Sequence, residues 1–227
     1  MITFYFHPTP NPMKVALFLK EAGLEYDIVP VDTMKGEQHD SGFRAVNPNG
    51  KLPAIKDDDG TIVFDSNAIL LYLAEKHGQF AGKPEDRAAL LSWLMFIATG
   101  VGPYSGQSVH FRHFAHDGLD YAVNRYLREV ERHYQVLNDH LADREYIVSG
   151  EYSIVDMAAW GWLDRSTVVL GEGSMDAFPN LLRWFNGVNA RPAVAAARSI
   201  GEGIAFKSER DEVALRALFP QNYNDDA

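Results

Sequence analysis

The segment from Asn47 to Gly78 constrains the fold of this chain more than any other part of the sequence. It contains two short β-rich runs followed by an apolar helical pattern that Gly78 terminates. The DDDG sequence between the two runs predicts a hairpin turn, because its glycine accepts a positive φ. Pro53 stands at the mouth of the first run, where a central strand rarely tolerates proline. The predicted elements are strands over 51–56 and 61–64 and a helix over 66–76.

The residues before this segment predict two more strands and a helix between them. Asn11 and Pro12 indicate the start of that helix, with Asn11 as the N-cap and Pro12 at the first helical position. Gly23 is placed to end it. The other predicted elements are strands over 2–6 and 26–31 and a single helical turn over 41–45. The order β-α-β-(α)-β-β-α indicates a small mixed sheet with flanking helices.

The composition changes after a linker predicted at 79–84, and no later run predicts a strand. Apolar residues at helical spacing instead predict helices over 85–101, 120–141, 153–170, 179–190 and 192–200. The tail from Ser208 is charged and ends in acidic residues, so we expect part of it to be mobile. These features predict a first domain of residues 1–80, an all-helical domain of residues 86–205 and a tail of residues 206–227.

The sequence SIVD, from Ser153 to Asp156, matches a capping box, with aspartate in place of the more usual glutamate. A catalytic Ser–Asp pair is the alternative interpretation. Because the pattern opens an apolar helix, we assign the two residues to folding.

Charge and cysteine content exclude several kinds of function. The 227 residues carry a formal net charge of −10 and no dense basic cluster, which argues against nucleic acid and anionic membranes as partners. With no cysteine, the chain can form no disulfide, thiolate metal site or protein thiol nucleophile. Neither a signal peptide nor an apolar run long enough to span a bilayer is predicted. A cytoplasmic protein is therefore the expectation.

His110, His113 and His116 are spaced three residues apart, which raises the question of a metal site. Successive steps of three drift around a helix, so the first and last would not share a face. No other metal-binding pattern accompanies them. We interpret them as polar or site-lining histidines and predict no metal.

Three features of the 47–78 segment suit a small zwitterionic peptide with two carboxylates. Lys51 lies beside a predicted strand, and a cis bond before Pro53 would leave the Leu52 backbone free to pair with an extended ligand. Asp65 and Ser66 begin a helix, where they could hold an ammonium and a carboxylate. Each feature also has a structural explanation: a solvated lysine, an edge-strand proline and simple helix capping.

Taken together, these residues resemble the cytosolic glutathione transferases over nearly the whole chain. The similar segments are NPNGKLPAI, FDSNAILLYLAEK and SIVDMAAW, in an α/β thioredoxin-like domain followed by an all-helical domain. FHPTPNPMKVALFL and RYLREVERHYQVLN look more narrowly like the bacterial Nu-class enzymes, which are glutathione-dependent disulfide-bond oxidoreductases. The resemblance implies glutathione as ligand and a homodimer.

The resemblance also implies a role for particular residues. Gln38 and Lys51 would contact the glycyl end of glutathione, and the Leu52 backbone would pair with its cysteinyl unit beside cis-Pro53. Asp65 and Ser66 would hold the γ-glutamyl ammonium and carboxylate. Thr9 and Asn11 would lie near the sulfur as the catalytic residues, and Arg132 would reach the site from the partner subunit.

The chemistry implied is reduction of small disulfides by bound glutathione. Asn11 stands where many transferases have a catalytic serine or cysteine, and the chain has no thiol of its own. We therefore expect glutathione to supply both sulfurs, one attacking the disulfide and the second resolving the mixed disulfide. The alternatives are conjugation of glutathione to an electrophile, and glutathione binding or regulation without turnover.

Overall fold

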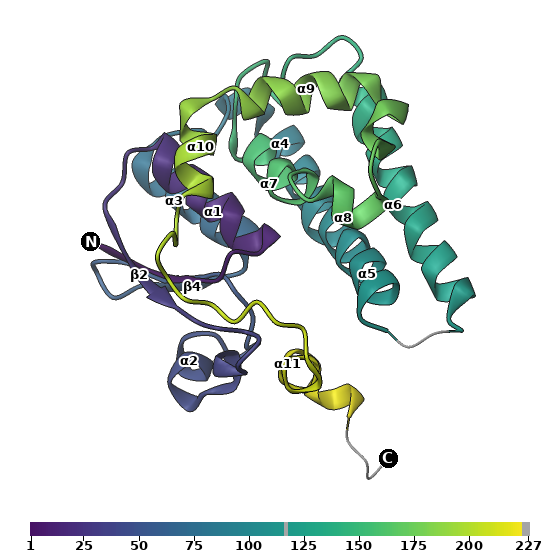
Figure 1. Cartoon of the computed structure of the whole chain (residues 1–227). Coiled ribbons are helices and arrows are strands. Elements are labelled where there is room, and N and C mark those ends of the chain that lie inside the picture. The colour runs from purple at the N-terminus through teal and green to yellow at the C-terminus, as the bar shows by residue number, and fades with distance from the viewer. Residues whose placement is uncertain (116–117, 224–227) are drawn as a thin grey trace.

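The computed structural model describes residues 1–115 and 118–223 of the chain. A small sheet with its helices lies beside a larger group of helices, and residues 201–223 run from the sheet toward the larger group (Figure 1). The predicted fold class, an α/β domain followed by a helical one, is confirmed. The division near 79–85 stays a prediction.

The sheet contains four strands in the order β2-β1-β3-β4. Strand β1 runs parallel to β2, whereas β1–β3 and β3–β4 are antiparallel pairs. The alternation of buried and less buried residues along β1 places Phe4 and Phe6 in the main core. The strands are β1 Ile2–Phe6, β2 Tyr26–Pro30, β3 Ala54–Lys56 and β4 Ile62–Phe64.

Helices α1 (Pro10–Glu21) and α3 (Ser66–His77) cover one face of the sheet, and α2 (Ser41–Val46) covers the other (Figure 1). A short 3-10 turn, η1 (Glu37–His39), precedes α2. The α2 face has its own small cluster around Phe43, separate from the main core. Helix α1 is shared by both domains, because it packs against α7 and α10 as well as α3.

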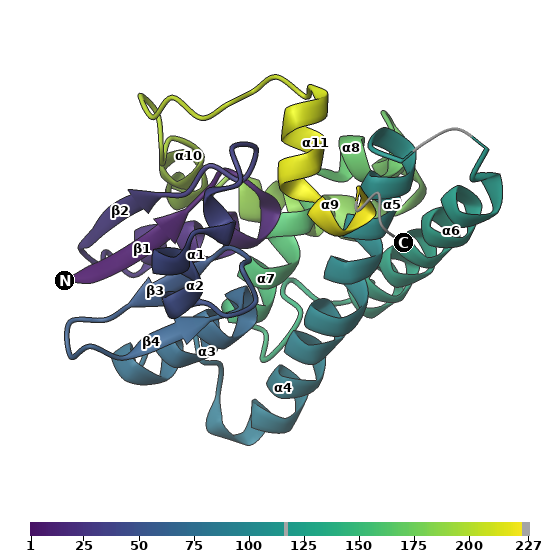
Figure 2. The same ribbon diagram turned by 90° about the horizontal axis from the view of Figure 1, so that it is seen from below.

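The second domain is a bundle of helices in which the described residues contain no strand (Figure 2). Its elements are η2 Pro84–Asp86, α4 Arg87–Phe96, η3 Ile97–Val101, α5 Gly102–His113, α6 Asp120–His140, α7 Ile154–Leu163, α8 Ser166–Leu170, η4 Ser174–Ala177, α9 Pro179–Asn189 and α10 Pro192–Arg198. The tail adds α11 Glu212–Leu218 and η5 Pro220–Asn222.

Several predicted boundaries were wrong, each for a local reason. Helix α1 begins at Pro10 with Thr9 as N-cap, so Asn11 lies inside the first turn. Strand β3 begins only after Pro53, whose nitrogen has no hydrogen to donate. The helix predicted to end at 101 continues through a π-helical turn into α5, and the one predicted over 153–170 is interrupted between α7 and α8.

The continuous helix from Pro84 to His113 is long and apolar enough to meet the length and composition criteria for a membrane span. From the sequence, no apolar run long enough to span a bilayer was predicted. The helix packs against α6, α7 and α8, and its buried residues belong to the main core. A core helix of a helical bundle meets the same criteria, and 39% of the apolar window in this helix is buried.

The described part of the charged tail contains two helical elements, α11 and η5. Asp211 caps α11 by accepting a hydrogen bond from the Ala214 amide at 2.8 Å. The segment before it is tied to the sheet domain, where the Lys207 amide donates to Asp32 Oδ2 at 2.7 Å. The tail therefore crosses from one domain toward the other.

The predicted capping box at α7 is confirmed, with the Ser153 amide and hydroxyl both donating to Asp156 Oδ2. The other carboxylate oxygen accepts from the Ile147 amide at 3.1 Å and from the Trp184 indole at 2.8 Å. Burial raises the pKa of Asp156 to about 6 against these donors, which favour the charged form. The Asp156 carboxylate thus connects α7 to α9, through Trp184, and to the loop before α7, through Ile147.

Asp156→Ala should lower the free energy of unfolding by about 3 kcal/mol, since it removes a helix cap and leaves buried donors without an acceptor. Urea unfolding at fixed protein concentration measures the loss, with Asp176→Ala, an exposed acidic residue, as control. A loss no larger than that of the control would mean that the buried hydrogen bonds contribute little.

Candidate functional site

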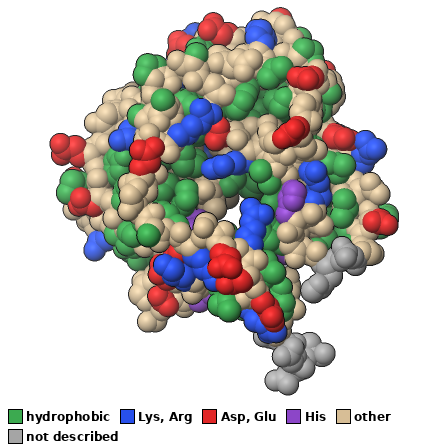
Figure 3. Space-filling view, viewed as in Figure 1, with side chains coloured by type: hydrophobic (Ala, Val, Ile, Leu, Met, Phe, Trp, Pro, Cys, Tyr) green, Lys and Arg blue, Asp and Glu red, His purple; other side chains and the backbone are tan. Residues whose placement is uncertain are grey.

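Two pockets lie side by side in the cleft between the domains. The small pocket, of about 360 Å³, is formed mainly by the sheet domain. The large pocket, of about 730 Å³, lies between α5 and the C-terminal segment. Lys51 lines both, so the two are adjoining parts of one cleft. Figure 3 shows the hollow between the domains, with basic side chains and histidines around it.

The small pocket contains most of the residues predicted for a peptide site. Its predicted residues are Asn11, Lys51, Leu52, Pro53, Asp65 and Ser66, and the additional ones are Asn47, Asn49 and Phe64. The Leu52–Pro53 bond is cis. Residues far apart in the sequence thus meet here because β3, α1 and α3 all end or begin at the same edge.

Asp65 and Ser66 form the acidic and hydroxyl side of the small pocket. Asp65 caps α3, its Oδ1 accepting from the Asn67 amide at 2.8 Å and the Ala68 amide at 3.2 Å. It does so at φ 71°, a conformation that is uncommon for residues other than glycine. Asp65 is nevertheless exposed, and Ser66 begins the helix beside it. Capping and ligand binding are therefore compatible at this helix start.

Asn47 was not predicted as a site residue, and it builds the turn that carries Lys51. Its buried side chain donates to the Lys51 carbonyl at 2.6 Å and accepts from the Asn49 amide at 3.0 Å. The turn is completed by Gly50, whose positive φ suits glycine. The Lys51 side chain remains exposed at the junction of the two pockets. The NPNG sequence was the signal for this turn.

Asn11 presents an amide to the small pocket in a defined orientation. The indole Nε1 of Trp162, on α7, lies 3.1 Å from Asn11 Oδ1. Because an indole N–H can only donate, this contact assigns the oxygen of Asn11 and leaves its NH₂ group as a donor. Thr9 precedes it as the N-cap of α1, and its hydroxyl makes no cap hydrogen bond to the helix.

Three predicted residues, Thr9, Gln38 and Arg132, do not line the small pocket. The amide of Gln38 is buried and donates to the Ala217 carbonyl of α11 at 2.9 Å. Arg132 lies on α6, exposed and paired with Glu129 at 3.0 Å, and it lines a different depression, on the side of α8 and η4. The roles predicted for these residues, and for the other site residues, stay predictions.

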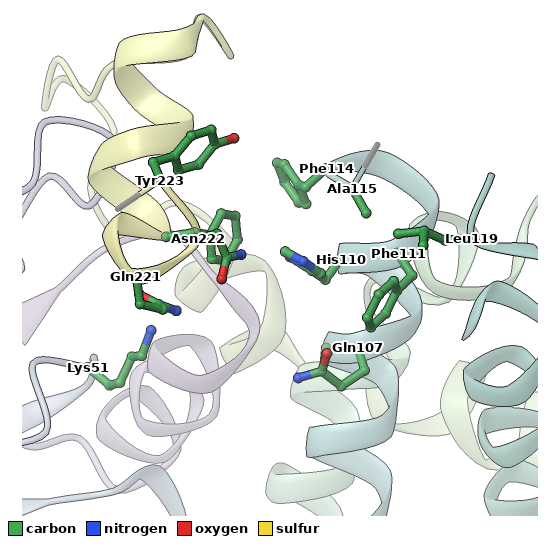
Figure 4. A pocket seen from close by; sticks show the side chains of 12 residues that line it. Lys51, Gln107, His110, Phe111, Phe114, Ala115, Leu119, Gln221, Asn222 and Tyr223 are labelled. Carbon is green, nitrogen blue, oxygen red and sulfur yellow. The ribbon is translucent and has the colours of Figure 1, made fainter. Parts of the chain in front are cut away.

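The large pocket has one wall from α5 and another from the C-terminal segment (Figure 4). The Phe219 ring lies 4.6 Å from that of His110 and 5.7 Å from that of Phe114. Burial lowers the pKa of His110, which favours the neutral ring. Gln221, Asn222 and Tyr223 were not predicted here. The signal for their placement was Asp211 before the EVALRAL run, a helix start that anchors the segment.

The acidic turn at 57–59 is the one group of three carboxylates in the described residues that is close enough together to suggest a metal ion. The Lys76 ammonium already lies among them, 2.7 Å from Asp57 Oδ2 and 3.1 Å from Asp58 Oδ1. Tyr72 also donates to Asp57 Oδ2, at 2.6 Å. Although burial alone would raise the pKa of Asp57, these hydrogen bonds hold it well below its usual range. The cluster is therefore a clamp between the hairpin and α3.

The two histidines of α5 have different surroundings, and the prediction that His110 and His116 lie on different faces stays a prediction. His110 lines the large pocket, whereas Nε2 of His113 lies 2.9 Å from the Val168 carbonyl. His116 lies outside the described residues.

Comparison with known proteins identifies the family. Residues 9–76 match the glutathione S-transferase N-terminal domain and residues 120–187 match the C-terminal domain. The chain belongs to the glutathione S-transferase family, as the sequence predicted.

Within that family, the chain is similar to bacterial disulfide-bond oxidoreductases. It is 42% identical to the disulfide-bond oxidoreductase YfcG of Escherichia coli K12, over 87% of this chain and 94% of the relative. It is 38% identical to YghU of the same organism, over 85% of this chain and 72% of that protein. The predicted likeness to these enzymes is confirmed.

Solved structures give the same family and fold. A glutathione transferase from Pseudomonas putida, with one glutathione disulfide bound per subunit, is 34% identical, with a TM-score of 0.80 over 88% of this chain and 91% of that one. A Burkholderia graminis enzyme with two glutathione molecules per subunit is 35% identical, with a TM-score of 0.78 over 87% of each chain.

Tyr72→Phe should lower the free energy of unfolding by about 1–2 kcal/mol at pH 7, because Asp57 loses one of its hydrogen-bond donors. The pKa of Asp57 is lower in the folded than in the unfolded state, so its contribution is present above pH 4 and is lost in stronger acid. The difference between wild type and variant should therefore narrow below about pH 4.

Urea unfolding between pH 2.5 and pH 8 measures this difference. Tyr121→Phe, at a tyrosine that is 84% exposed, is the matched control. A difference that does not depend on pH would mean that Tyr72 contributes by packing and not through the Asp57 carboxylate.

Proposed function

We propose that this chain is a glutathione-dependent disulfide-bond oxidoreductase that uses bound glutathione thiolates to reduce small disulfides. The observation that carries the proposal is the small pocket, where Lys51, Asp65 and Ser66 surround an oriented amide of Asn11. Two similar bacterial proteins are named for this activity. The absence of cysteine from the chain means that the sulfur chemistry belongs to the ligand.

Glutathione binds in the small pocket by its two charged ends. The Asp65 carboxylate receives the γ-glutamyl ammonium, and Ser66 with the N-terminus of α3 receives the adjacent carboxylate. Lys51 attracts the glycyl carboxylate at the other end of the pocket. The main chain of Leu52, beside Pro53, pairs with the cysteinyl unit between these ends. Gln38 lies behind this region, held by α11, and helps to shape the glycyl end.

The Asn11 amide stabilises the thiolate. Lowering a thiol pKa from about 8.5 to about 6.5 requires roughly 2.7 kcal/mol. A helix N-terminus typically provides about 0.3–1 kcal/mol, and α1 lacks amide hydrogens at Pro10 and Pro12. A hydrogen bond to a charged acceptor adds about 1.5–3 kcal/mol. The donor side of Asn11 therefore supplies the larger part, with the unused hydroxyl of Thr9 as a second donor.

The reaction proceeds in two exchanges. The first glutathione thiolate attacks one sulfur of the disulfide, which forms a mixed disulfide and releases one substrate thiolate. A second glutathione thiolate then attacks the glutathione sulfur of that mixed disulfide, which forms glutathione disulfide and releases the other substrate thiolate. The two protons given up by glutathione return to the two product thiolates. The large pocket, joined to the small one at Lys51, holds the second reactant.

Conjugation of glutathione to an electrophile is a second candidate, favoured by the aromatic lining of the large pocket. Parallel assays distinguish the two reactions: glutathione-dependent reduction of a small mixed disulfide, and conjugation of chlorodinitrobenzene. Disulfide turnover well above conjugation supports the proposed function. Conjugation alone would replace it, and glutathione binding without either activity would indicate a regulatory protein.

We also propose that the protein is a Nu-class enzyme that forms a homodimer in the cytoplasm. Strand β4, at the edge of the sheet, exposes Ile62 and Phe64, and α4 exposes Met95. Phe64 also lines the small pocket, so a partner subunit covering it would help to enclose glutathione. Arg132 is exposed and lines a depression other than its own small pocket, which leaves it available to the partner's site.

Asn11→Ala should lower the rate of disulfide reduction by roughly 10- to 100-fold, because the thiolate loses a charge-assisted hydrogen bond. The loss should be largest near pH 6 and shrink toward pH 9, where glutathione ionises without help. Rates between pH 6 and pH 9 measure it, with Asn186→Ala, at an exposed asparagine on α9, as control.

Trp162→Phe tests the same role from the other partner of the hydrogen bond. It keeps an aromatic side chain at this position and removes the N–H group that orients Asn11. It should reproduce part of the Asn11→Ala loss with the same pH dependence. Wild-type rates in both variants would exclude Asn11 as the thiolate donor.

Arg132→Ala should weaken glutathione binding by about 10-fold without dissociating the dimer, because a charge-assisted contact from the partner is lost. Calorimetry measures the affinity, and sedimentation measures the assembly state. Arg128→Ala, one turn earlier on α6 and also exposed, is the matched control. If Arg132→Ala binds glutathione with unchanged affinity, Arg132 is not part of the glutathione site.

A further inference from the structure

Lys14 is the one charged residue in the buried 12–19 run of α1, and its side chain is 1% exposed. Its ammonium Nζ lies 3.3 Å from Ser66 Oγ, the hydroxyl that lines the small pocket. Within residues 1–115 and 118–223, no carboxylate forms an ion pair with it. A buried ammonium without a counter-charge is costly, because it loses hydration that nothing replaces.

The absence of a side chain at Gly161 leaves space for the Lys14 side chain. A Cβ atom at Gly161, on α7, would lie 2.5 Å from Lys14 Cγ and 2.7 Å from the Pro10 carbonyl oxygen. The glycine therefore lets Lys14 pass between α1 and α7 toward Ser66. Asp65, at the start of α3, is the charged group whose field acts on Lys14. Its carboxylate is exposed and already caps the helix.

We propose that Lys14 is a positioning residue for glutathione, whose γ-glutamyl carboxylate supplies the counter-charge that the buried ammonium lacks. Lys14 donates to Ser66 Oγ, which directs the Ser66 hydroxyl hydrogen toward the ligand carboxylate. The carboxylate thus receives a hydrogen bond from Ser66 and lies near the ammonium behind it. This inference rests on the proposed binding of glutathione in the small pocket.

The arrangement has opposite consequences for stability and for binding. Burial lowers the pKa of Lys14 to about 7, so the folded protein without ligand holds this proton less tightly than the unfolded chain does. The unfolded state binds more protons between about pH 7 and pH 10, so Lys14 destabilises the fold most below pH 7. The ligand carboxylate reverses the effect, because it favours the charged form of Lys14, whose amine takes up a proton when the ligand binds.

Lys14→Met keeps the length of the side chain and removes its charge. We expect it to raise the melting temperature at pH 6 by about 5 °C and to weaken binding of S-methylglutathione roughly 10- to 100-fold. Lys20→Met, at an exposed lysine on the same helix, is the control and should change neither quantity. A variant that folds, is not stabilised and binds as wild type does would overturn the proposal.

Proton uptake tests the same point in the wild-type protein. S-methylglutathione has no thiol to titrate, and its binding at pH 7.5 in buffers of different ionisation enthalpy should take up about half a proton or more. His110→Asn should retain this uptake and Lys14→Met should lose it, which separates Lys14 from the histidine of the large pocket. Wild-type binding without proton uptake overturns the role of Lys14. Absence of binding to the wild type would instead contradict the proposed function.

Discussion

The rest of the structure depends on the burial of α1 on all sides. Residues 12–19 of this helix are all buried, because the sheet, α3, α7 and α10 surround it. Over residues 12–19 the helix has no solvent face, so this part of its sequence carries no amphipathic stripe. Its first turns nevertheless bear Asn11, which lines the small pocket, and Lys14, which reaches Ser66 from inside the protein. The contact between domains and the candidate site are thus built from the same helix.

Much of the fold was predictable because local patterns and packing agree. The β-rich runs, the glycine at the end of α3 and the capping box at Ser153 all specify elements that the tertiary structure keeps. The boundaries were less predictable where a proline or a neighbouring element decides them, as at Pro53. The continuation of α4 into α5 could not be inferred from local signals, since Gly102 and Pro103 are typical of a helix end.

The site was predictable in part. Asp65, Ser66 and Lys51 lie in one segment of the sequence. The resemblance to the family predicts that they bind glutathione. The donor that orients Asn11 comes from Trp162, far along the sequence, and nothing local links the two. The same holds for Gln38, whose amide is engaged by α11. Long-range hydrogen bonds of this kind depend on how helices cross, which a single sequence does not specify.

The C-terminal segment has a practical consequence for work with this protein. It is attached to the sheet domain at Asp32 and Gln38, and it forms one wall of the large pocket through Phe219 and Tyr223. An affinity tag or fusion partner joined directly behind Tyr223 would follow a residue that lines that pocket. The N-terminus lies at the far side of the sheet, as Figure 2 shows, and is the better attachment point. Kinetic constants obtained with the two kinds of tagged protein are therefore not interchangeable.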